Sequence, residues 1–362
     1  MSLTLRNLDA NCPSCLKDFA GHLCSIAAEH DKTVLGGALL KMFQDVFFTQ
    51  RSAIFRYVAH KGSRSVIKHA ALDATGLHTH DAYLTSPNLG SSLEEHPVLT
   101  RSVNTGTVIS EMSNDIHVYV FPMFRHEAVY LLIQLERTAS FLKDELDLVA
   151  ISLDFFRNHL ELIDYAETDT LTGLLNRKTL DENLDRILAS ASGDSEGEAN
   201  PNYPVRRHTH PDDSRNWLSI IDIDHFKRIN DTFGHLIGDE ILLLISRLMK
   251  DAFRLDDQLF RFGGEEFVVV LQPTSLKDAS MVLDRFRRIV EEYQFPMVGH
   301  ITVSLGFTRI EYYDSPSDLL DRADKALYFA KENGRNRMEN YEALHQAGSL
   351  GNDREKSVID LF

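Results

Sequence analysis

The chain has 362 residues, of which 43% are hydrophobic and 25% charged, and its formal net charge is −16. This length predicts two domains, each with enough apolar residues for a core, and the acidic balance argues against a general nucleic-acid binder. No apolar run is long enough to span a membrane and the N-terminus lacks a signal-peptide pattern, so we expect a cytoplasmic protein.

The cysteines lie close together near the N-terminus, at Cys12, Cys15 and Cys24, and His22 stands between the last two. Three thiolates and one imidazole form a ligand set that suits tetrahedral Zn²⁺. The spacing differs from standard zinc motifs, because joint ligation by His22 and Cys24 needs an irregular backbone. Ordinary reduced cysteines in a helical segment and a redox-sensing CxxC pair are the alternatives.

The first predicted domain covers residues 1–138. Residues 34–48 have the apolar spacing of a helix, and short β-rich runs separated by polar loops follow at 53–58, 117–121 and 128–133. This order predicts an α+β domain with an antiparallel sheet. It resembles a GAF-type sensory domain, which implies a sensing and dimerising role but no particular ligand. A scaffold that dimerises the protein and senses nothing is the alternative.

A linker helix is predicted over residues 139–167. Its apolar residues alternate spacings of four and three, the a and d pattern of a coiled coil: Leu142, Leu146, Val149, Leu153, Phe156, Leu160 and Ile163. The pattern predicts a parallel two-helix stalk that joins two subunits. The alternative is an amphipathic helix that packs on its own domain.

The second predicted domain covers residues 168–342, where helices and strands alternate, and a flexible tail is expected over 343–362. The stretch 192–216 lacks apolar periodicity and is long for a connection, so we expect a surface insertion there. Its His208 and His210 are interpreted as solvent-exposed loop residues, with metal binding as the alternative.

Two carboxylates mark the end of a predicted buried strand in this domain. The apolar run 217–221 leads into Asp222 and Asp224, and strand geometry places both on one face. Adjacent carboxylates suit a hard cation such as Mg²⁺, which prefers oxygen ligands. A solvated strand end is the alternative for this pair taken alone.

A Gly-Gly pair separates two further strand-like runs. Gly263 and Gly264 predict a tight hairpin within residues 261–267, and the absence of side chains there lets a ligand approach the backbone. Glu265, just beyond the glycines, can face the same cation as Asp222. A hairpin without a function is the alternative for an isolated pair of glycines.

Residues 263–267 read Gly-Gly-Glu-Glu-Phe and resemble the signature of the GGDEF family of diguanylate cyclases, in its GGEEF form. Further stretches resemble family motifs in the correct order, at 169–177, 222–239 and 323–336. The resemblance implies a central antiparallel sheet flanked by helices, related to the palm of nucleotidyl cyclases. It also implies a homodimer whose subunits each bind one GTP and together form cyclic di-GMP and pyrophosphate.

The family motifs imply metal and catalytic roles. Asp222, the Ile223 carbonyl and Glu265 would hold two Mg²⁺ ions in each active site, with Mn²⁺ as an alternative. Glu266 would assist as a base or as a metal ligand.

The same motifs imply a GTP site. Lys331 and Arg335 would hold the terminal phosphates, and Asn230 with Asp239 would read the guanine edge. The residues that would contact the substrate are Phe226, Lys227, Asn230, Asp239, Gly263, Gly264, Lys331 and Arg335.

Arg254 and Asp257 stand where the family has its RxxD inhibitory site, which implies feedback binding of cyclic di-GMP. Arg285 is a candidate for a second contact, with a solvated helix face as its alternative. The rival to an active cyclase is a catalytically silent receptor of cyclic di-GMP. The intact metal and substrate residues named above argue against that rival.

Overall fold

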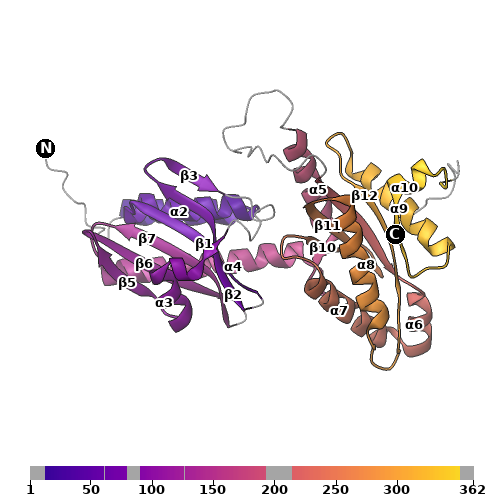
Figure 1. The fold of residues 1–362 in the computed structure, drawn as a ribbon. Helices are drawn as coiled ribbons and strands as arrows, with labels where there is room; N and C mark the ends of the chain where they lie inside the picture. The colour runs from indigo at the N-terminus through magenta and orange to yellow at the C-terminus, as the bar shows by residue number, and fades with distance from the viewer. Residues whose placement is uncertain (1–12, 61, 80–89, 126, 193–213, 351–362) are drawn as a thin grey trace. The chain divides into compact units, whose positions relative to one another are not determined.

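The computed structural model describes residues 13–60, 62–79, 90–125, 127–192 and 214–350, coloured in chain order in Figure 1. The chain forms two compact units, Met1–Ala166 and Glu167–Phe362. We describe each unit separately.

The N-terminal unit contains an antiparallel sheet of the order β3-β2-β1-β7-β6-β5, with the short β4 paired to β2. Its strands are β1 Arg51–His60, β2 Ser63–Asp73, β3 Gly76–Thr79, β4 Ser91–Ser92, β5 Ile109–Ser113, β6 Ile116–Arg125 and β7 Ala128–Arg137. The predicted α+β organisation with an antiparallel sheet is confirmed for the described part of this unit.

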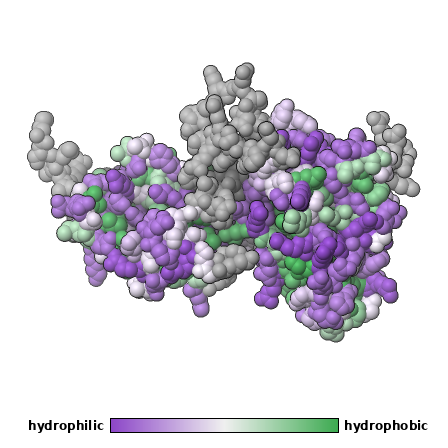
Figure 2. Space-filling view, viewed as in Figure 1, coloured by the Kyte–Doolittle hydropathy of each residue, from purple (hydrophilic) through white to green (hydrophobic). Residues whose placement is uncertain are grey.

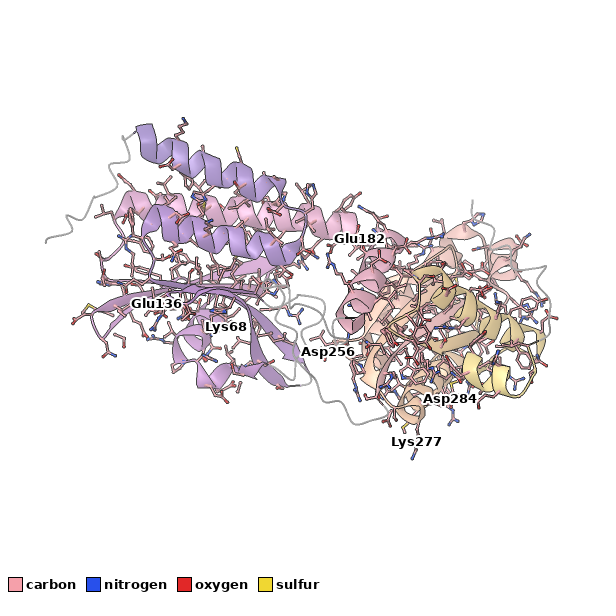
Figure 3. The ribbon with its side chains drawn as sticks, turned by 90° about the horizontal axis from the view of Figure 1, so that it is seen from above. Lys68, Glu136, Glu182, Asp256, Lys277 and Asp284 are labelled. Atoms are coloured by element: carbon pink, nitrogen blue, oxygen red, sulfur yellow. The ribbon has the colours of Figure 1, made fainter. Side chains whose placement is uncertain are left out.

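Helices cover both faces of this sheet (Figure 3). One face packs against α1 Pro13–Ala28, α2 Lys32–Phe47 and α4 Lys143–Glu167, and the other against the 3₁₀ turn Leu93–Glu95 and α3 Pro97–Thr105. Successive side chains of β1 point to opposite faces of the sheet. Ile54 therefore packs with the helices of the first face, while Ala53 and Phe55 pack with Leu99 of α3 on the other face.

The coiled-coil prediction for α4 is wrong for the seam that we expected. Val149, Leu153, Phe156, Leu160 and Ile163 are all buried in the hydrophobic core of their own unit, with residues of α1, α2 and the sheet. A heptad seam and the apolar stripe of a packed helix differ by only about 0.1 residue per turn, so about three heptads do not separate them. The alternative, an amphipathic helix packed on its own domain, is therefore correct for these residues.

The C-terminal unit contains a six-stranded sheet of the order β13-β12-β9-β11-β10-β8. Its four central strands are antiparallel, and the short β8 and β13 pair in parallel at the edges. The strands are β8 Leu175–Asn176, β9 Arg215–Ile223, β10 Gln258–Arg261, β11 Glu266–Thr274, β12 Val303–Arg309 and β13 Met338–Asn340. This is the mixed α+β fold with a central antiparallel sheet that the resemblance implied.

Helices also cover both faces of the second sheet. Alternate residues of β11 point to opposite sides, so that Val269 packs with α7 and α8, and Val268 with α5 and α9. Ser275 and Ser315 begin α8 and α9 by accepting hydrogen bonds from backbone N–H groups three residues later. The helices are α5 Arg177–Ser192, α6 Phe226–Phe233, α7 His235–Ala252, α8 Leu276–Glu292, α9 Pro316–Glu332 and α10 Tyr341–Gln346.

The end of the chain departs from the prediction. Residues 343–346 were expected in a flexible tail, but they belong to α10, where Leu344 is buried. Residues 351–362 and most of the predicted insertion, 193–213 with His208 and His210, lie outside the described part of the chain.

Hydrophilic side chains predominate on the face of the molecule drawn in Figure 2. None of the helices in the described ranges combines the length and the apolar character that crossing a bilayer requires.

Candidate active site

The predicted hairpin is confirmed, and it brings the candidate acidic residues together. β10 and β11 pair as antiparallel neighbours, with residues 262–265 connecting them. Glu266 lies opposite Asp222 in the β11–β9 register, and the Ile223 N–H donates to the Glu265 carbonyl at 3.4 Å. The strand pairing therefore joins Asp222, Ile223, Glu265 and Glu266, which sequence alone placed more than forty positions apart.

These carboxylates form an acidic site with a lysine at its edge. Burial raises the pKa of Asp222, which is 4% exposed, while the charge of Lys331 opposes the shift. Burial and the neighbouring Asp222 also raise the pKa values of Glu265 and Glu266. Lys331 on α9 places its Nζ 2.8 Å from Asp222 Oδ2. Burial and mutual repulsion thus disfavour the ionised carboxylates, and additional positive charge at the site would stabilise them.

The donor atoms suit a magnesium ion that arrives with a nucleotide. Carboxylate and carbonyl oxygens are hard ligands, and Mg²⁺ commonly binds one or two carboxylates together with substrate phosphates. Within residues 13–350, excluding the undescribed gaps, no three His, Cys, Asp or Glu side chains are arranged to hold a metal by themselves. An ion bound by Asp222 and Glu265 would take its remaining ligands from phosphate and water.

The predicted guanine-reading residues lie at the junction of α6 and α7. Gly234, with φ of 86°, separates the two helices, and its N–H donates to the Asn230 carbonyl at 2.9 Å. A Cβ atom on Gly238 would overlap Asn230 Oδ1, so the half-buried Asn230 side chain lies directly against this glycine. Asp239 follows Gly238 and is exposed. The structure therefore brings the amide of Asn230 beside the helix turn that carries Asp239.

The remaining residues predicted to contact the substrate differ in their exposure to solvent. Phe226 is buried in the core at the start of α6, whereas Lys227 beside it is exposed. Arg335 is exposed in the loop after α9, and its charge acts on the Asp222 carboxylate. Lys331 and Arg335 thus place positive charge at the acidic site.

The turn after α4 is linked to the hairpin by a residue pair that sequence reasoning did not assign. Arg261 donates to both carboxylate oxygens of Asp169 at 3.1 and 3.2 Å, and to the Gly264 carbonyl at 3.0 Å. Burial acts to raise the pKa of Asp169, but hydrogen bonds from Thr172 and Arg261 lower it overall. Asp169 was noted only as part of a motif, because its partner lies 92 positions away.

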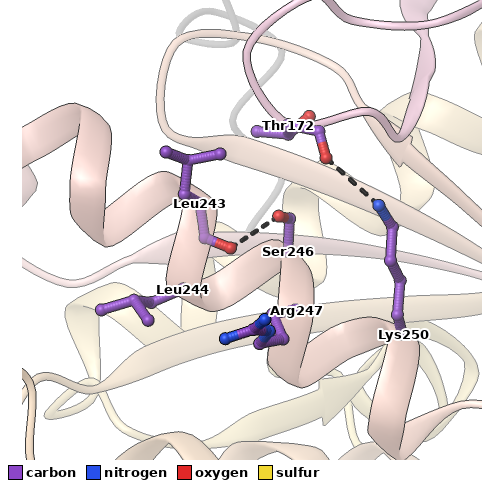
Figure 4. A pocket seen from close by; sticks show the side chains of 6 residues that line it. All are labelled: Thr172, Leu243, Leu244, Ser246, Arg247 and Lys250. Atoms are coloured by element: carbon purple, nitrogen blue, oxygen red, sulfur yellow. Dashed lines mark hydrogen bonds between the residues drawn. The ribbon is translucent and has the colours of Figure 1, made fainter. Parts of the chain in front are cut away.

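Figure 4 shows a second link from this turn, a hydrogen bond of 3.2 Å from Lys250 Nζ on α7 to the Thr172 carbonyl. It borders an open pocket of about 370 Å³ lined by Thr172, Leu243, Leu244, Ser246, Arg247 and Lys250.

The predicted inhibitory residues form a compact turn before β10. Asp257 accepts hydrogen bonds from the backbone N–H groups of Arg254 at 2.9 Å and Gln272 at 3.1 Å, and burial raises its pKa. Arg285 on α8 donates to the Ala252 carbonyl, which places its guanidinium close to this turn. Arg254 itself is exposed. The structure therefore brings Arg254, Asp257 and Arg285 to one surface.

The predicted zinc ligands are not assembled by the described residues. Cys12 and the Cys15 side chain lie outside the described part of the structure. His22 and the exposed Cys24 both belong to the regular helix α1, where residues two positions apart point in different directions. His22 Nε2 lies 3.5 Å from Asp45. This geometry argues against joint ligation and favours an ordinary reduced Cys24.

Comparison with known proteins agrees with the site. Residues 202–337 match the family model for the diguanylate cyclase GGDEF domain. The chain is 42% identical over 188 residues to diguanylate cyclase DgcP of Pseudomonas aeruginosa, covering 51% of this chain and 25% of that protein. It is 38% identical over 192 residues to response regulator PleD of Caulobacter vibrioides, covering 51% of this chain and 38% of that protein.

A solved GGDEF domain of DgcB from Caulobacter crescentus, in complex with c-di-GMP, is 32% identical with a TM-score of 0.42 and covers 49% of this chain and 96% of that one. The matches thus span well under half of the two curated relatives' own length. The C-terminal unit of this chain contains a GGDEF domain.

Proposed function

We propose that this protein is a diguanylate cyclase that condenses two GTP molecules into one cyclic di-GMP and two pyrophosphates. The observation that carries the proposal is the acidic site formed by Asp222, Glu265 and Glu266, with Lys331 and Arg335 at its edge. The GGDEF domain match and the curated diguanylate cyclase relatives support it. We place the reaction in the cytoplasm.

The chemistry is a nucleotidyl transfer. The 3′-oxygen of one GTP bonds to the α-phosphorus of the other, the bond from that phosphorus to pyrophosphate breaks, and the hydroxyl proton passes to a base. A second, equivalent step closes the ring. Each step requires that the nucleophile be held in line with the bond that breaks.

The side chains of the site suit these steps. Asp222, the Ile223 carbonyl and Glu265 would hold Mg²⁺, or Mn²⁺ in its place, which neutralises charge on the reacting phosphates. Lys331 and Arg335 would bind the phosphates that leave as pyrophosphate. Glu266, whose pKa is raised, is suited to accept the hydroxyl proton.

Selectivity for guanine follows from the residues at the α6–α7 junction. The Asp239 carboxylate can accept hydrogen bonds from the N–H donors of the guanine edge, and the Asn230 amide can donate to its carbonyl. Adenine presents a different pattern of donors and acceptors, so it would leave these groups unpaired. We therefore expect GTP to be used and ATP to be rejected.

The decisive experiment incubates the purified protein with GTP and Mg²⁺ and separates the nucleotides by chromatography. We expect cyclic di-GMP from the parent, none from Asp222→Asn, and no cyclic product from ATP. A dimeric parent that binds cyclic di-GMP, after bound product has been removed, but forms none would instead be the silent receptor.

We further propose that the enzyme is a homodimer joined through the exposed side of α4, because each subunit would bind only one GTP. Ile151, Leu162 and Tyr165 are 54%, 65% and 70% exposed. They lie at spacings of three and four with Leu148, Phe155 and Asn158, of which Leu148 and Phe155 also pack in part against the core of their own unit.

Introducing charge on this face is expected to separate the subunits. The Ile151→Glu, Leu162→Glu double variant should be monomeric by size exclusion with light scattering, and its cyclase activity should fall at least about tenfold, because buried charge opposes association. Met112→Glu, at a residue 66% exposed on β5, serves as the control and should remain dimeric. A double variant that stays dimeric would show that this face of α4 is not the dimer interface.

For the N-terminal unit we propose a GAF-like regulatory role. Its antiparallel sheet, covered by helices on both faces, supports the resemblance, and α4 connects this unit directly to the GGDEF domain.

We also propose that cyclic di-GMP inhibits the enzyme at Arg254, Asp257 and Arg285. Arg254→Ala is expected to raise the inhibition constant for cyclic di-GMP at least about tenfold, because an arginine contact to phosphate is lost. Initial rates measured against added cyclic di-GMP would check this. Arg288→Ala, an exposed arginine on the same helix as Arg285, should leave inhibition unchanged. Equal inhibition of the parent and Arg254→Ala would place the inhibitory site elsewhere.

A further inference from the structure

Asp224, the second carboxylate at the end of β9, is engaged by the protein itself. Its side chain is 5% exposed. Oδ2 accepts hydrogen bonds from Thr302 Oγ1 at 2.6 Å and from the Asn336 backbone N–H at 3.0 Å, and Oδ1 accepts one from Ser304 Oγ at 2.7 Å. These bonds engage both oxygens, so donors of the protein itself hold the Asp224 carboxylate in place.

The bond to Asn336 reaches a loop in an uncommon conformation. Gly334, Arg335 and Asn336 follow one another with φ of 112°, 58° and 47°. Residues other than glycine rarely adopt the left-handed region, and such backbone persists only where its surroundings hold it. The carboxylate of Asp224, 112 positions earlier in the chain, supplies one such restraint on the loop.

The side chain of Asn336 supplies a second restraint. Its Nδ2 donates to Glu291 Oε1 at 2.7 Å, and its Oδ1 accepts from Arg287 Nη1 at 2.8 Å. Arg287 in turn donates to Glu291 Oε2 at 2.8 Å, so α8 presents both groups as a unit. Asn336 is therefore held by β9 through its backbone and by α8 through its side chain, while Arg335 remains exposed beside it.

We propose that Asp224 is a positioning residue that, by holding Asn336, directs Arg335 toward the terminal phosphates of GTP. The inference rests on the proposed function, since it takes Arg335 as a phosphate ligand. Asp222 and Asp224 lie two positions apart where β9 ends. One short segment thus fixes both the metal-binding carboxylate and the anchor of the phosphate-binding arginine, and this sets the distance between metal and phosphate.

The test measures binding without turnover. The probe is 3′-deoxy-GTP with Mg²⁺, which lacks the attacking hydroxyl, and its dissociation constant is measured by calorimetry. We expect Asp224→Asn to weaken binding about tenfold, because the charged acceptor is lost. In an Arg335→Ala background the same change should weaken binding less than about twofold, since residues acting through one contact are not additive.

Two further variants separate positioning from a general loss of structure. Ser304→Ala removes a donor to the other Asp224 oxygen, so it should lower the melting temperature and leave binding of the probe unchanged. Asn336→Gly tolerates the positive φ but loses the contacts to Arg287 and Glu291, so it should weaken binding even if Asp224→Asn does not fold.

The outcomes distinguish this inference from the proposed function. Two outcomes overturn the positioning role alone, provided that the parent binds the probe. In the first, Asp224→Asn binds the probe as tightly as the parent does. In the second, the Asp224→Asn change costs as much affinity in the Arg335→Ala background as in the parent. A parent that does not bind the probe overturns both.

Discussion

Replacing Gly306 by alanine is expected to destabilise the C-terminal unit strongly, because a Cβ at this position would meet the backbone of α9. Gly306 lies on β12 where α9 packs against the sheet, and a Cβ there would overlap Leu327 N and Ala323 O and lie 2.7 Å from Leu327 Cα. These are backbone atoms of the helix, so no side-chain rotation relieves the overlap. We expect the free energy of unfolding to fall by about 3 kcal/mol or more.

Such a loss lowers the melting temperature of a unit of this size by about 6–12 °C. Trp217, the single tryptophan of the chain, is buried on β9 of the same unit, so its fluorescence reports this transition. Gly264→Ala is the matched control for stability, because a Cβ at Gly264 meets no atom within 4 Å. An unchanged fluorescence transition in Gly306→Ala would contradict the close packing of α9 on β12.

Replacing Glu265 by glutamine is expected to reduce cyclic di-GMP formation at least about 100-fold. The change keeps the shape of the side chain but removes the charge that would bind Mg²⁺, and charge stabilisation by a metal contributes several kcal/mol to such a reaction. The rate of product formation at saturating GTP and Mg²⁺ measures the loss. Glu292→Gln, at an exposed position on α8, should retain parent activity.

A Glu265→Gln enzyme with more than about a tenth of parent activity would remove this residue from the metal site.

The metal-free stability of the parent is expected to depend on pH through these acids. The pKa of Glu265 is raised in the folded protein above its ordinary value of 4.5, so the folded state binds protons more readily than the unfolded chain. Its ionisation therefore destabilises the fold as the pH rises from the ordinary pKa through the raised pKa of the folded state. At neutral pH without Mg²⁺, Glu265→Gln should have a higher melting temperature than the parent.

This difference in melting temperature should shrink as the pH falls to 4.5 and below, because the parent carboxyl then becomes protonated in the unfolded chain as well as in the folded state. Melting curves of both proteins in chelator across this range give the comparison. A Glu265→Gln protein less stable than the parent at neutral pH would mean that favourable contacts of the Glu265 carboxylate outweigh the cost of its burial and its repulsion by Asp222.

Local sequence patterns were sufficient for several features of this chain. The Gly263–Gly264 pair predicted the β10–β11 hairpin correctly, because two glycines between strand-like runs leave few other backbone solutions. The apolar run before Asp222 predicted β9 for the same kind of local reason. The family motifs indicated which acidic and basic residues belong to one candidate site.

Other features depended on which surfaces meet. The apolar periodicity of α4 was visible in the sequence, but whether Val149 and Leu153 face a second subunit or their own sheet depends on what lies opposite them. Likewise, Asp222 and Asp224 look equivalent in sequence. Their surroundings differ, because Asp222 lies beside Glu266 and Lys331, whereas Asp224 accepts hydrogen bonds from hydroxyl groups and the Asn336 N–H.

The sequence by itself therefore determined the order of elements, the α+β class and the residue types of the candidate site, since these follow from short-range backbone preferences and from motifs. Only the tertiary structure decided the partners of Asp169, Asp224 and the α4 stripe. Those partners lie far away in the chain, and ion pairing, hydrogen bonding and burial act through distance in space, which sequence separation does not reveal.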